Sequence, residues 1–181
     1  MHLYQNMPCV VRQMLSTAWA LALAGCVAIP ENVKPIDNFQ LPKYLGKWYE
    51  IARLDHSFER GLTKVTAEYS LRDDGGVKVL NRGYSAQDNK WKEAVGKAYF
   101  VKGPDLGFLK VSFFWPFYGS YVVFDLDQAN YQHALVCGPD TSYFWILARQ
   151  PKMDDATQAA LLSRATALGF ATNNLIYPQH D

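Results

Sequence analysis

The sequence has few cysteines and no excess of charge of either sign. Only three of its 181 residues are cysteine, and 18 basic residues are balanced by 17 acidic ones, so the net charge is +1. No run of Lys or Arg is longer than two. Nucleic-acid binding depends on a strongly basic surface, and we therefore predict no nucleic-acid partner.

No hydrophobic run is long enough for a transmembrane helix. The uncharged run MLSTAWALALAG over residues 14–25 follows Arg12 and precedes Cys26, and it is shorter than the roughly 20 residues that span a bilayer. A basic residue before a short apolar run is typical of a secretion signal. Residues 23–26, LAGC, resemble the lipobox of bacterial lipoproteins, in which the Cys is acylated. We predict a signal peptide over 1–25 and lipidation of Cys26, whose acyl chains would give durable membrane attachment.

The cysteines leave no disulfide in the mature domain. Cys9 lies in the predicted signal segment and Cys26 carries the anchor, so Cys137 stands alone. A free Cys on a strand is usually a small buried hydrophobe, and we predict no catalytic residue. His56 and His133 have no second ligand at metal-binding spacing, and we predict neither a metal nor another cofactor.

The remaining chain is predicted to form one domain. Residues 26–38 contain Pro30 and Pro35 without apolar periodicity, which favours a tether, and residues 39–178 form the folded part. Short alternating runs separated by turn signals predict an all-β fold, an eight-stranded antiparallel up-and-down β-barrel with one helix packed outside. The predicted strands cover about 47–55, 63–72, 76–84, 91–101, 107–114, 119–126, 131–137 and 142–149, followed by a helix over 154–168 and a short strand over 174–177 beside the first.

Eight strands enclose an interior that is either filled by side chains or holds one small ligand. Small residues mixed with aromatics and a few polar groups favour an apolar pocket that orients one polar ligand end. The alternation of strand residues, with Tyr118 added from the loop at the mouth, predicts that the pocket is lined by Tyr69, Val79, Asn81, Ala98, Phe100, Leu109, Val111, Phe113, Tyr118, Tyr121, Val123 and Trp145. It also points Glu50 inward, where a carboxylate needs a partner such as Arg or Tyr, or a raised pKa.

The aromatic connection over residues 114–118 has two interpretations. Either its rings are exposed and mark a membrane or protein contact, or they fold back and plug the pocket. Residues 55–61, at the same end of the barrel, are a candidate lid.

Two distant segments are predicted to close the barrel base. In up-and-down order the start of the first strand lies beside the end of the eighth, so the guanidinium of Arg149 can stack on the indole of Trp48. Gly46 precedes this Trp in the segment GKWYEIAR of residues 46–53. Together with VFDLD at 123–127 and WILAR at 145–149, the segment resembles the signature of the lipocalin family, most closely its bacterial outer-membrane lipoproteins, with apolipoprotein D next.

The resemblance implies a function. It implies a non-enzymatic binding protein that stores or transports fatty acids or lysophospholipids and maintains the cell envelope under stress. Because Val27 rather than Asp follows Cys26, it also implies sorting to the outer membrane, on the periplasmic side. Two alternatives stay open, a lipocalin-type enzyme acting on a bound lipid and a tetrapyrrole scavenger. A homodimer is also left open.

Overall fold

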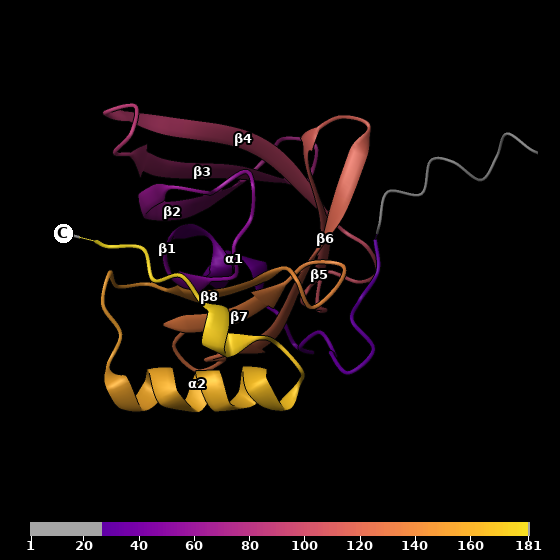
Figure 1. Cartoon of the computed structure of the whole chain (residues 1–181). Coiled ribbons are helices and arrows are strands. Elements are labelled where there is room, and N and C mark those ends of the chain that lie inside the picture. Colours follow the sequence, from indigo (N-terminus) through magenta and orange to yellow (C-terminus); the bar gives the residue numbers. More distant parts are fainter. Residues whose placement is uncertain (1–26, 181) are drawn as a thin grey trace, which may run out of the picture.

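The eight predicted strands form a closed antiparallel barrel. The computed structural model describes residues 27–180, so the predicted signal peptide over 1–25 and the lipidation site Cys26 lie outside the described residues. Each strand pairs with the next, and β8 pairs with β1 to close the barrel, which confirms the predicted fold class (Figure 1). The strands are β1 (Gly46–Arg53), β2 (Leu62–Leu71), β3 (Val77–Ser85), β4 (Lys90–Phe100), β5 (Phe108–Phe114), β6 (Phe117–Leu126), β7 (His133–Cys137) and β8 (Phe144–Ala148).

Side chains alternate between two apolar layers, as the period of two requires. Inward residues such as Val79, Ala98 and Leu109 form a cluster inside the barrel. Outward residues such as Leu135 and Phe144 form a second cluster beneath the C-terminal helix. This second cluster lies outside the barrel, on one side of it. Because a ligand is expected in the interior, the inner cluster is the one that concerns ligand binding.

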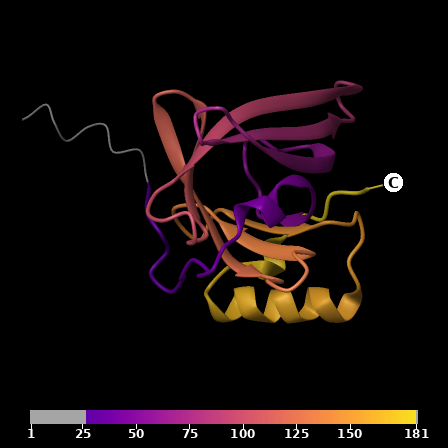
Figure 2. The same ribbon diagram turned by 180° about the vertical axis from the view of Figure 1, so that it is seen from behind.

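Helix α2 (Asp155–Ala167) packs outside the barrel, as predicted (Figure 2). Its N-cap is Asp154, whose carboxylate accepts a hydrogen bond from the backbone N–H of Thr157 at 2.8 Å, which satisfies one of the free donors at a helix start. Leu161 and Ala165 are buried against the outer cluster. Gly169 has a φ of +91° just beyond the helix end, a conformation that glycine adopts without strain.

The N-terminal segment is not the free tether that we predicted. Val33 is buried against the outer cluster, and Val27 and Ile29 pack beside it. The backbone N–H of Ile36 donates to the carbonyl of Val123 at 2.9 Å. Proline-rich sequence without periodicity indicated a linker, but the segment uses isolated apolar residues and backbone hydrogen bonds to lie along the barrel wall.

A short helix and the C-terminal tail complete the fold. Helix α1 (Leu41–Tyr44) is one turn that crosses the base of the barrel. The predicted strand at 174–177 is reduced to one bridge between Arg53 and Ile176, after the 3₁₀ helix η1 (Thr172–Asn174). The tail continues past 178, because the N–H of Lys64 donates to the carbonyl of Gln179. Within residues 27–180, no helix combines the length and the apolarity needed to cross a bilayer.

Candidate functional site

The base of the barrel is closed by Arg149 and Trp48, as the strand order predicted. The guanidinium carbon lies 4.0 Å from the centre of the indole ring. Arg149 also donates to the carbonyls of Lys47, Lys43 and Leu45 at 2.8, 2.7 and 2.9 Å. One planar cation thus joins β8, the start of β1 and helix α1.

The signature glycine and tryptophan have separate roles in this closure. Gly46 has a φ of +90°, which a residue with a side chain adopts only with strain. The indole N–H of Trp48 donates to the carbonyl of Tyr44 at 2.8 Å, and the Trp side chain is completely buried. The turn at Gly46 therefore places the indole below the barrel interior, and the hydrogen bond to Tyr44 anchors α1 to the indole.

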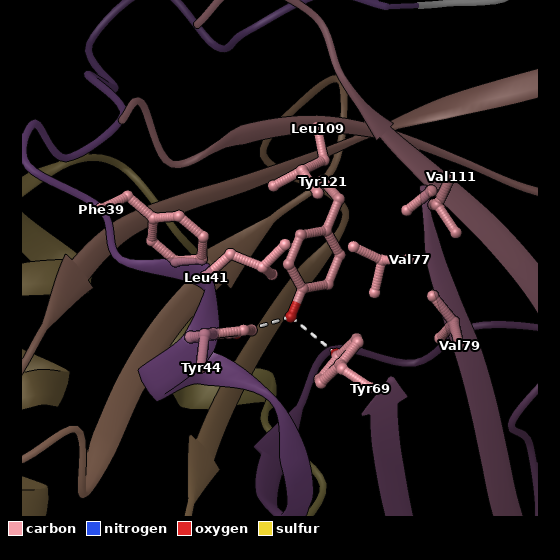
Figure 3. A pocket seen from close by; sticks show the side chains of 10 residues that line it. Phe39, Leu41, Tyr44, Tyr69, Val77, Val79, Leu109, Val111 and Tyr121 are labelled. Atoms are coloured by element: carbon pink, nitrogen blue, oxygen red, sulfur yellow. Dashed lines mark hydrogen bonds between the residues drawn. The ribbon is translucent and has the colours of Figure 1, made fainter. Parts of the chain in front are cut away.

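A small apolar cavity lies above this base. Its volume is about 20 Å³, enough for about one water molecule. Its lining comes from α1, from Phe39 just before it, and from β2 through β6 (Figure 3). The lining residues are Phe39, Leu41, Tyr44, Tyr69, Val77, Val79, Ala98, Leu109, Val111 and Tyr121. The interior of this conformation is therefore nearly filled, and a larger ligand enters only if lining side chains move.

Three tyrosines supply the polar groups of the cavity. The hydroxyl of Tyr121 lies 2.7 Å from that of Tyr44 and 2.7 Å from that of Tyr69 (Figure 3). The pKa of all three phenols is raised, mainly because the hydroxyls are buried. The triad is therefore neutral at physiological pH and can exchange hydrogen bonds with an uncharged or anionic ligand group.

The mouth half of the barrel is open to solvent. Ala67 and Asn81 face each other on the inner pleat of β2 and β3, and both are only partly buried. Ala94 lies opposite Asn81 on β4 and is exposed. Phe113 on β5 is also half-buried, and its ring lies against Gly96, where an added Cβ would come within 2.8 Å of it. The interior thus widens from the closed base toward the mouth.

The structure brings most of the predicted lining residues together. Six of them border the cavity, namely Tyr69, Val79, Ala98, Leu109, Val111 and Tyr121. Four others belong to the inner cluster without touching the cavity, namely Phe100, Phe113, Val123 and Trp145. Asn81 lies on the inner pleat nearer the mouth. Contact of these residues with a ligand stays a prediction.

The inward placement of Tyr118 was wrong. Its ring lies on the outer face, 5.1 Å from Nζ of Lys110 and 6.5 Å from the ring of Tyr99. We placed the start of the sixth strand at residue 119 and read Tyr118 as part of the mouth loop. Because β6 begins at Phe117, Tyr118 shares the outward pleat with Ser120.

Three lining residues that sequence reasoning missed come from the segment before β1. Phe39, Leu41 and Tyr44 reach the cavity from the base, whereas strand alternation identifies only residues on strands. The signal that was available is the segment FQLPKYL of residues 39–45, which carries these three side chains directly before the glycine of the signature. Val77, which strand alternation also places on the inner pleat of β3 beside Val79 and Asn81, lines the cavity as well.

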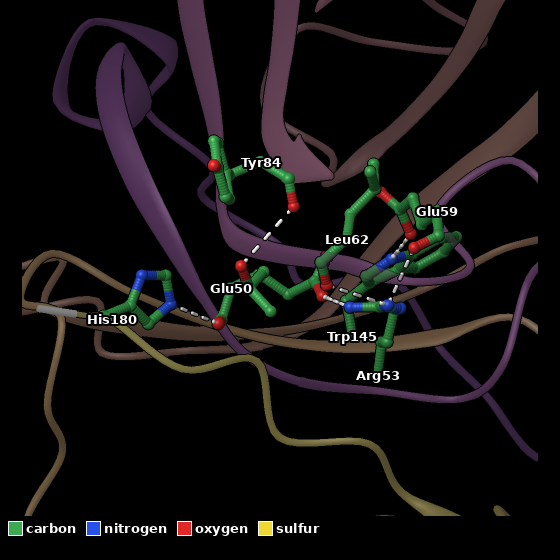
Figure 4. Close-up of polar contacts among 8 residues, drawn as sticks. Glu50, Arg53, Glu59, Leu62, Tyr84, Trp145 and His180 are labelled. Carbon is green, nitrogen blue, oxygen red and sulfur yellow. Dashed lines mark hydrogen bonds and ion pairs between the residues drawn. The ribbon is translucent and has the colours of Figure 1, made fainter. Parts of the chain in front are cut away.

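A buried ionic cluster lies under the loop between β1 and β2 (Figure 4). Nη1 of Arg53 is 2.5 Å from Oε1 of Glu50, and Nη2 donates to the carbonyl of Glu59 at 2.8 Å. The carboxylate of Glu59 accepts from the indole N–H of Trp145 at 3.0 Å. The prediction that an inward Glu50 needs a partner is confirmed, and its partner is Arg53.

A β-bulge explains why Arg53 reaches Glu50. Simple alternation places residues 50 and 53 on opposite faces of a strand. Between Glu50 and Ala52, however, β1 advances two residues while β8 advances one, so Ile51 and Ala52 both pack in the outer cluster. The extra residue returns Arg53 to the inner face, as bulges do.

The ionic cluster holds two carboxyl groups against one guanidinium. Burial, reinforced by the charge of Glu59, raises the pKa of Glu50 to about 8 despite the ion pair with Arg53. Burial also raises the pKa of Glu59. Burial and the positive charge of Arg53 lower the pKa of His56, in the same loop, to about 4. His56 is therefore neutral at physiological pH, and a proton on Glu50 relieves the excess of negative charge.

The groups considered for catalysis or metal binding do not converge. Cys137 is completely buried in the outer cluster under α2, away from the cavity, and burial raises the pKa of its thiol to about 12. Glu50 is held by Arg53. Among residues 27–180, no group of three or more His, Cys, Asp or Glu side chains is arranged to hold a metal ion.

Comparison with known proteins agrees with the geometry. A family model described as a lipocalin-like domain matches residues 39–180. The outer membrane lipoprotein Blc of Vibrio cholerae is 58% identical over 162 residues, which cover 90% of this chain and 95% of that protein. Apolipoprotein D of Bos taurus is 35% identical over 127 residues, covering 67% and 66% of the two chains.

A solved structure shares the fold at low sequence identity. Insecticyanin from the tobacco hornworm Manduca sexta superposes with a TM-score of 0.64 at 19% identity, covering 85% of this chain and 87% of that one. This likeness concerns the barrel alone. The family model, the relatives and the stacked Trp48 and Arg149 at the barrel base together show that the chain belongs to the lipocalin family.

Proposed function

We propose that this chain is a lipid-anchored lipocalin that binds fatty acids or lysophospholipids inside its barrel. It is attached through Cys26 to the periplasmic side of the outer membrane, where it stores or carries lipid and helps to maintain the envelope under stress. The name of the Vibrio cholerae relative, an outer membrane lipoprotein, supports this location. The binding role requires no catalytic residue.

The observation that carries the ligand class is the apolar cavity between a closed base and an open mouth. Apart from three phenol hydroxyls, the side chains that line it are aliphatic or aromatic. Each methylene group that leaves water for such a lining contributes about 0.8 kcal/mol. An acyl chain suits this space better than a polar metabolite, which would leave its hydrogen-bonding groups unpaired.

The small volume implies that binding is coupled to side-chain movement. Val111 and Phe113 lie on the inner pleat of β5 and are only partly buried. An acyl chain that displaces Phe113 from its position over Gly96 joins the cavity to the open mouth half. The ligand then replaces contacts that the side chains make with one another when the barrel is empty.

Two buried nitrogens support a polar ligand end at the mouth half. Nε of Arg53 and Nε2 of His56 have no hydrogen-bond partner in the described part of the chain. Unpaired buried polar atoms are costly, and a ligand headgroup or an ordered water can satisfy them. This arrangement favours an amphipathic ligand whose chain points to the base and whose headgroup lies near the ionic cluster.

Native mass spectrometry of the purified mature protein tests the proposal. We expect bound acyl lipid in the wild-type protein and loss of most of it in Ala98→Phe, which fills the cavity. Val95→Phe is the matched control, because Val95 lies on the same strand but is exposed at 59%. If Ala98→Phe is unstable, Val111→Phe serves the same purpose. Empty wild-type protein that also fails to take up added palmitate or lysophospholipid contradicts the proposal.

The same preparation separates the two alternatives. A tetrapyrrole ligand gives a coloured protein with absorbance in the visible range, whereas a bound fatty acid gives none. An enzyme releases a chemically altered lipid, and its turnover is lost in Cys137→Ala or Glu50→Gln. We expect a colourless protein that returns its lipid unchanged.

A further inference from the structure

The tip of the β5–β6 hairpin carries three exposed aromatic rings. Phe114, Trp115 and Phe117 are exposed at 81%, 75% and 68%, so they project into solvent and do not plug the barrel. Together with Pro116, which is also exposed, they form the aromatic tip. An apolar cluster of this kind on a surface marks a contact with a membrane or with a protein partner. The position of the tip on the barrel indicates which of the two it contacts.

The N-terminal segment runs along the same hairpin. The hydroxyl of Ser120, on β6, donates to the carbonyl of Ala28 at 2.5 Å, and further along, Ile36 pairs with Val123. From residue 28 to residue 36 the chain therefore follows β6 away from the aromatic tip, toward the base. In Figure 1 this indigo segment begins beside β5 and β6.

The start of the described chain is thus close to the aromatic tip. Ser120 is three residues from Phe117, about 10 Å along a strand. A chain anchored through Cys26 has at most about 7 Å of backbone between the anchor and Ala28. With so little free chain, an acylated Cys26 holds this side of the barrel against the bilayer surface.

Amphipathic side chains follow the aromatic tip on the outer face. Tyr118 and Tyr99 pack together there, and Nζ of Lys110 lies over the ring of Tyr118. Lys110 pairs with Ser120 in the sheet, so it lies level with Ala28. Tyrosine and lysine favour the headgroup region, where their polar ends stay hydrated. The order along the hairpin, apolar at the tip and amphipathic behind it, matches the order from hydrocarbon to headgroup in a bilayer.

We propose that the aromatic tip is a second membrane contact, which inserts into the phospholipid leaflet beside the acyl chains of Cys26. This inference rests on the lipid anchor of the proposed function. The occupant is a lipid bilayer, because the docked N-terminal segment brings this surface to the bilayer whenever the anchor is inserted. The contact turns the mouth of the barrel toward the membrane, so that lipid passes between the leaflet and the interior without crossing bulk water.

Fluorescence quenching in vesicles tests this contact. The acylated full-length mature protein is reconstituted in vesicles of phosphatidylethanolamine and phosphatidylglycerol that contain phospholipids with brominated acyl chains. We expect brominated lipid to quench the emission of the wild-type protein and Trp115→Phe to lose at least half of this quenching. Trp91→Phe is the control and keeps the quenching, because Trp91 lies on β4 and is not part of the aromatic tip. Like Trp115 it is exposed, at 44%, and the guanidinium of Arg82 lies over one face of its ring at 4.3 Å.

A second variant and a separate measurement distinguish the possible failures. Phe114→Ser/Phe117→Ser retains Trp115 but weakens the tip, and we expect at least twofold less quenching while the protein still floats with the vesicles. If the wild-type protein floats but Trp115 stays fully accessible to aqueous acrylamide, the membrane contact is refuted and a protein partner takes its place. If the intact mass shows no acyl chains and the protein does not float, the anchor of the proposed function is itself refuted.

Discussion

Nη1 of Arg53 lies 2.5 Å from Oε1 of Glu50, and both side chains are almost completely buried inside the mouth half of the barrel. The pair is not isolated, because the carboxyl group of Glu59 is buried nearby and both acids are drawn to one guanidinium. Two carboxylates and one cation leave an excess of negative charge in a medium that solvates it poorly. The protonation of Glu50 is therefore linked to the stability of the fold.

The first prediction concerns pH. Because burial raises the pKa of Glu50 from 4.5 to about 8, the folded state holds a proton that the unfolded state releases, and stability falls as the pH rises between these values. The lowered pKa of His56 acts in the opposite sense below pH 6.5, so the fall is seen most clearly from pH 6.5 to 8. We expect the free energy of unfolding to fall by at most about 1.4 kcal/mol per pH unit, the slope for the release of one proton.

Urea unfolding at several pH values measures this linkage. Glu50→Gln removes the titrating group, and we expect its stability to depend less on pH than that of the wild-type protein from pH 6.5 to 8. Glu68→Gln is the control, since Glu68 is exposed on β2, and its slope should equal that of the wild-type protein. Equal slopes for Glu50→Gln and the wild-type protein would show that Glu50 is ionised in the fold throughout this range.

The second prediction concerns closure of the base. Arg149→Ala removes the stack on Trp48 and three hydrogen bonds to carbonyls, and we expect it to lower the free energy of unfolding by about 3 kcal/mol. Arg149→Lys keeps the charge but cannot stack as a plane and reach all the carbonyls at once. We expect it to recover less than half of the loss in urea unfolding. Full recovery by Lys would mean that charge alone closes the barrel.

The third prediction concerns the tyrosine triad. Tyr121→Phe leaves the hydroxyls of Tyr44 and Tyr69 without the partner that joins them, and we expect a loss of about 2 kcal/mol in stability. Changing all three tyrosines to Phe removes both the donors and the acceptors. The triple variant should therefore cost less than the sum of the three single changes, as measured by urea unfolding. Additive costs would show that the hydroxyls do not act together.

The fourth prediction concerns Cys137. Its side chain is completely buried and its pKa is raised to about 12, so little thiolate is present at neutral pH and reagents cannot reach it. In acylated protein we expect a soluble disulfide reagent to label this thiol only as fast as the protein unfolds. Cys137→Ala should bind acyl ligands as the wild-type protein does. Rapid labelling of the folded protein, or lost binding, would contradict this account.

The sequence was sufficient to predict the strands and the closed barrel, because both follow from local patterns. Alternating residues define the strands, and Gly75, with a φ of +78°, supplies the turn between β2 and β3. The partners Trp48 and Arg149 follow from strand order alone. These features survive small errors in strand boundaries, which is why they were predicted correctly.

The errors, and the features that the sequence left open, lie where strand alternation does not determine the structure. The bulge in β1 brings Arg53 to Glu50, and no residue type in that segment announces it. The early start of β6 turns Tyr118 outward. The contribution of Phe39 and Leu41 to the cavity depends on how the N-terminal segment crosses the base, which is a matter of tertiary packing. The small cavity volume also depends on rotamers that strand patterns do not specify.

Photo-crosslinking with a fatty acid that carries a diazirine near the end of its acyl chain tests the central claim most directly. The labelled protein is digested, and the modified residues are identified by mass spectrometry. If the acyl chain binds inside the barrel, we expect adducts on inward residues of β4 and β5 such as Ala98, Leu109 and Val111, and their loss when unlabelled palmitate competes. Adducts confined to the outer face, or to residues 114–117, would contradict binding in the interior.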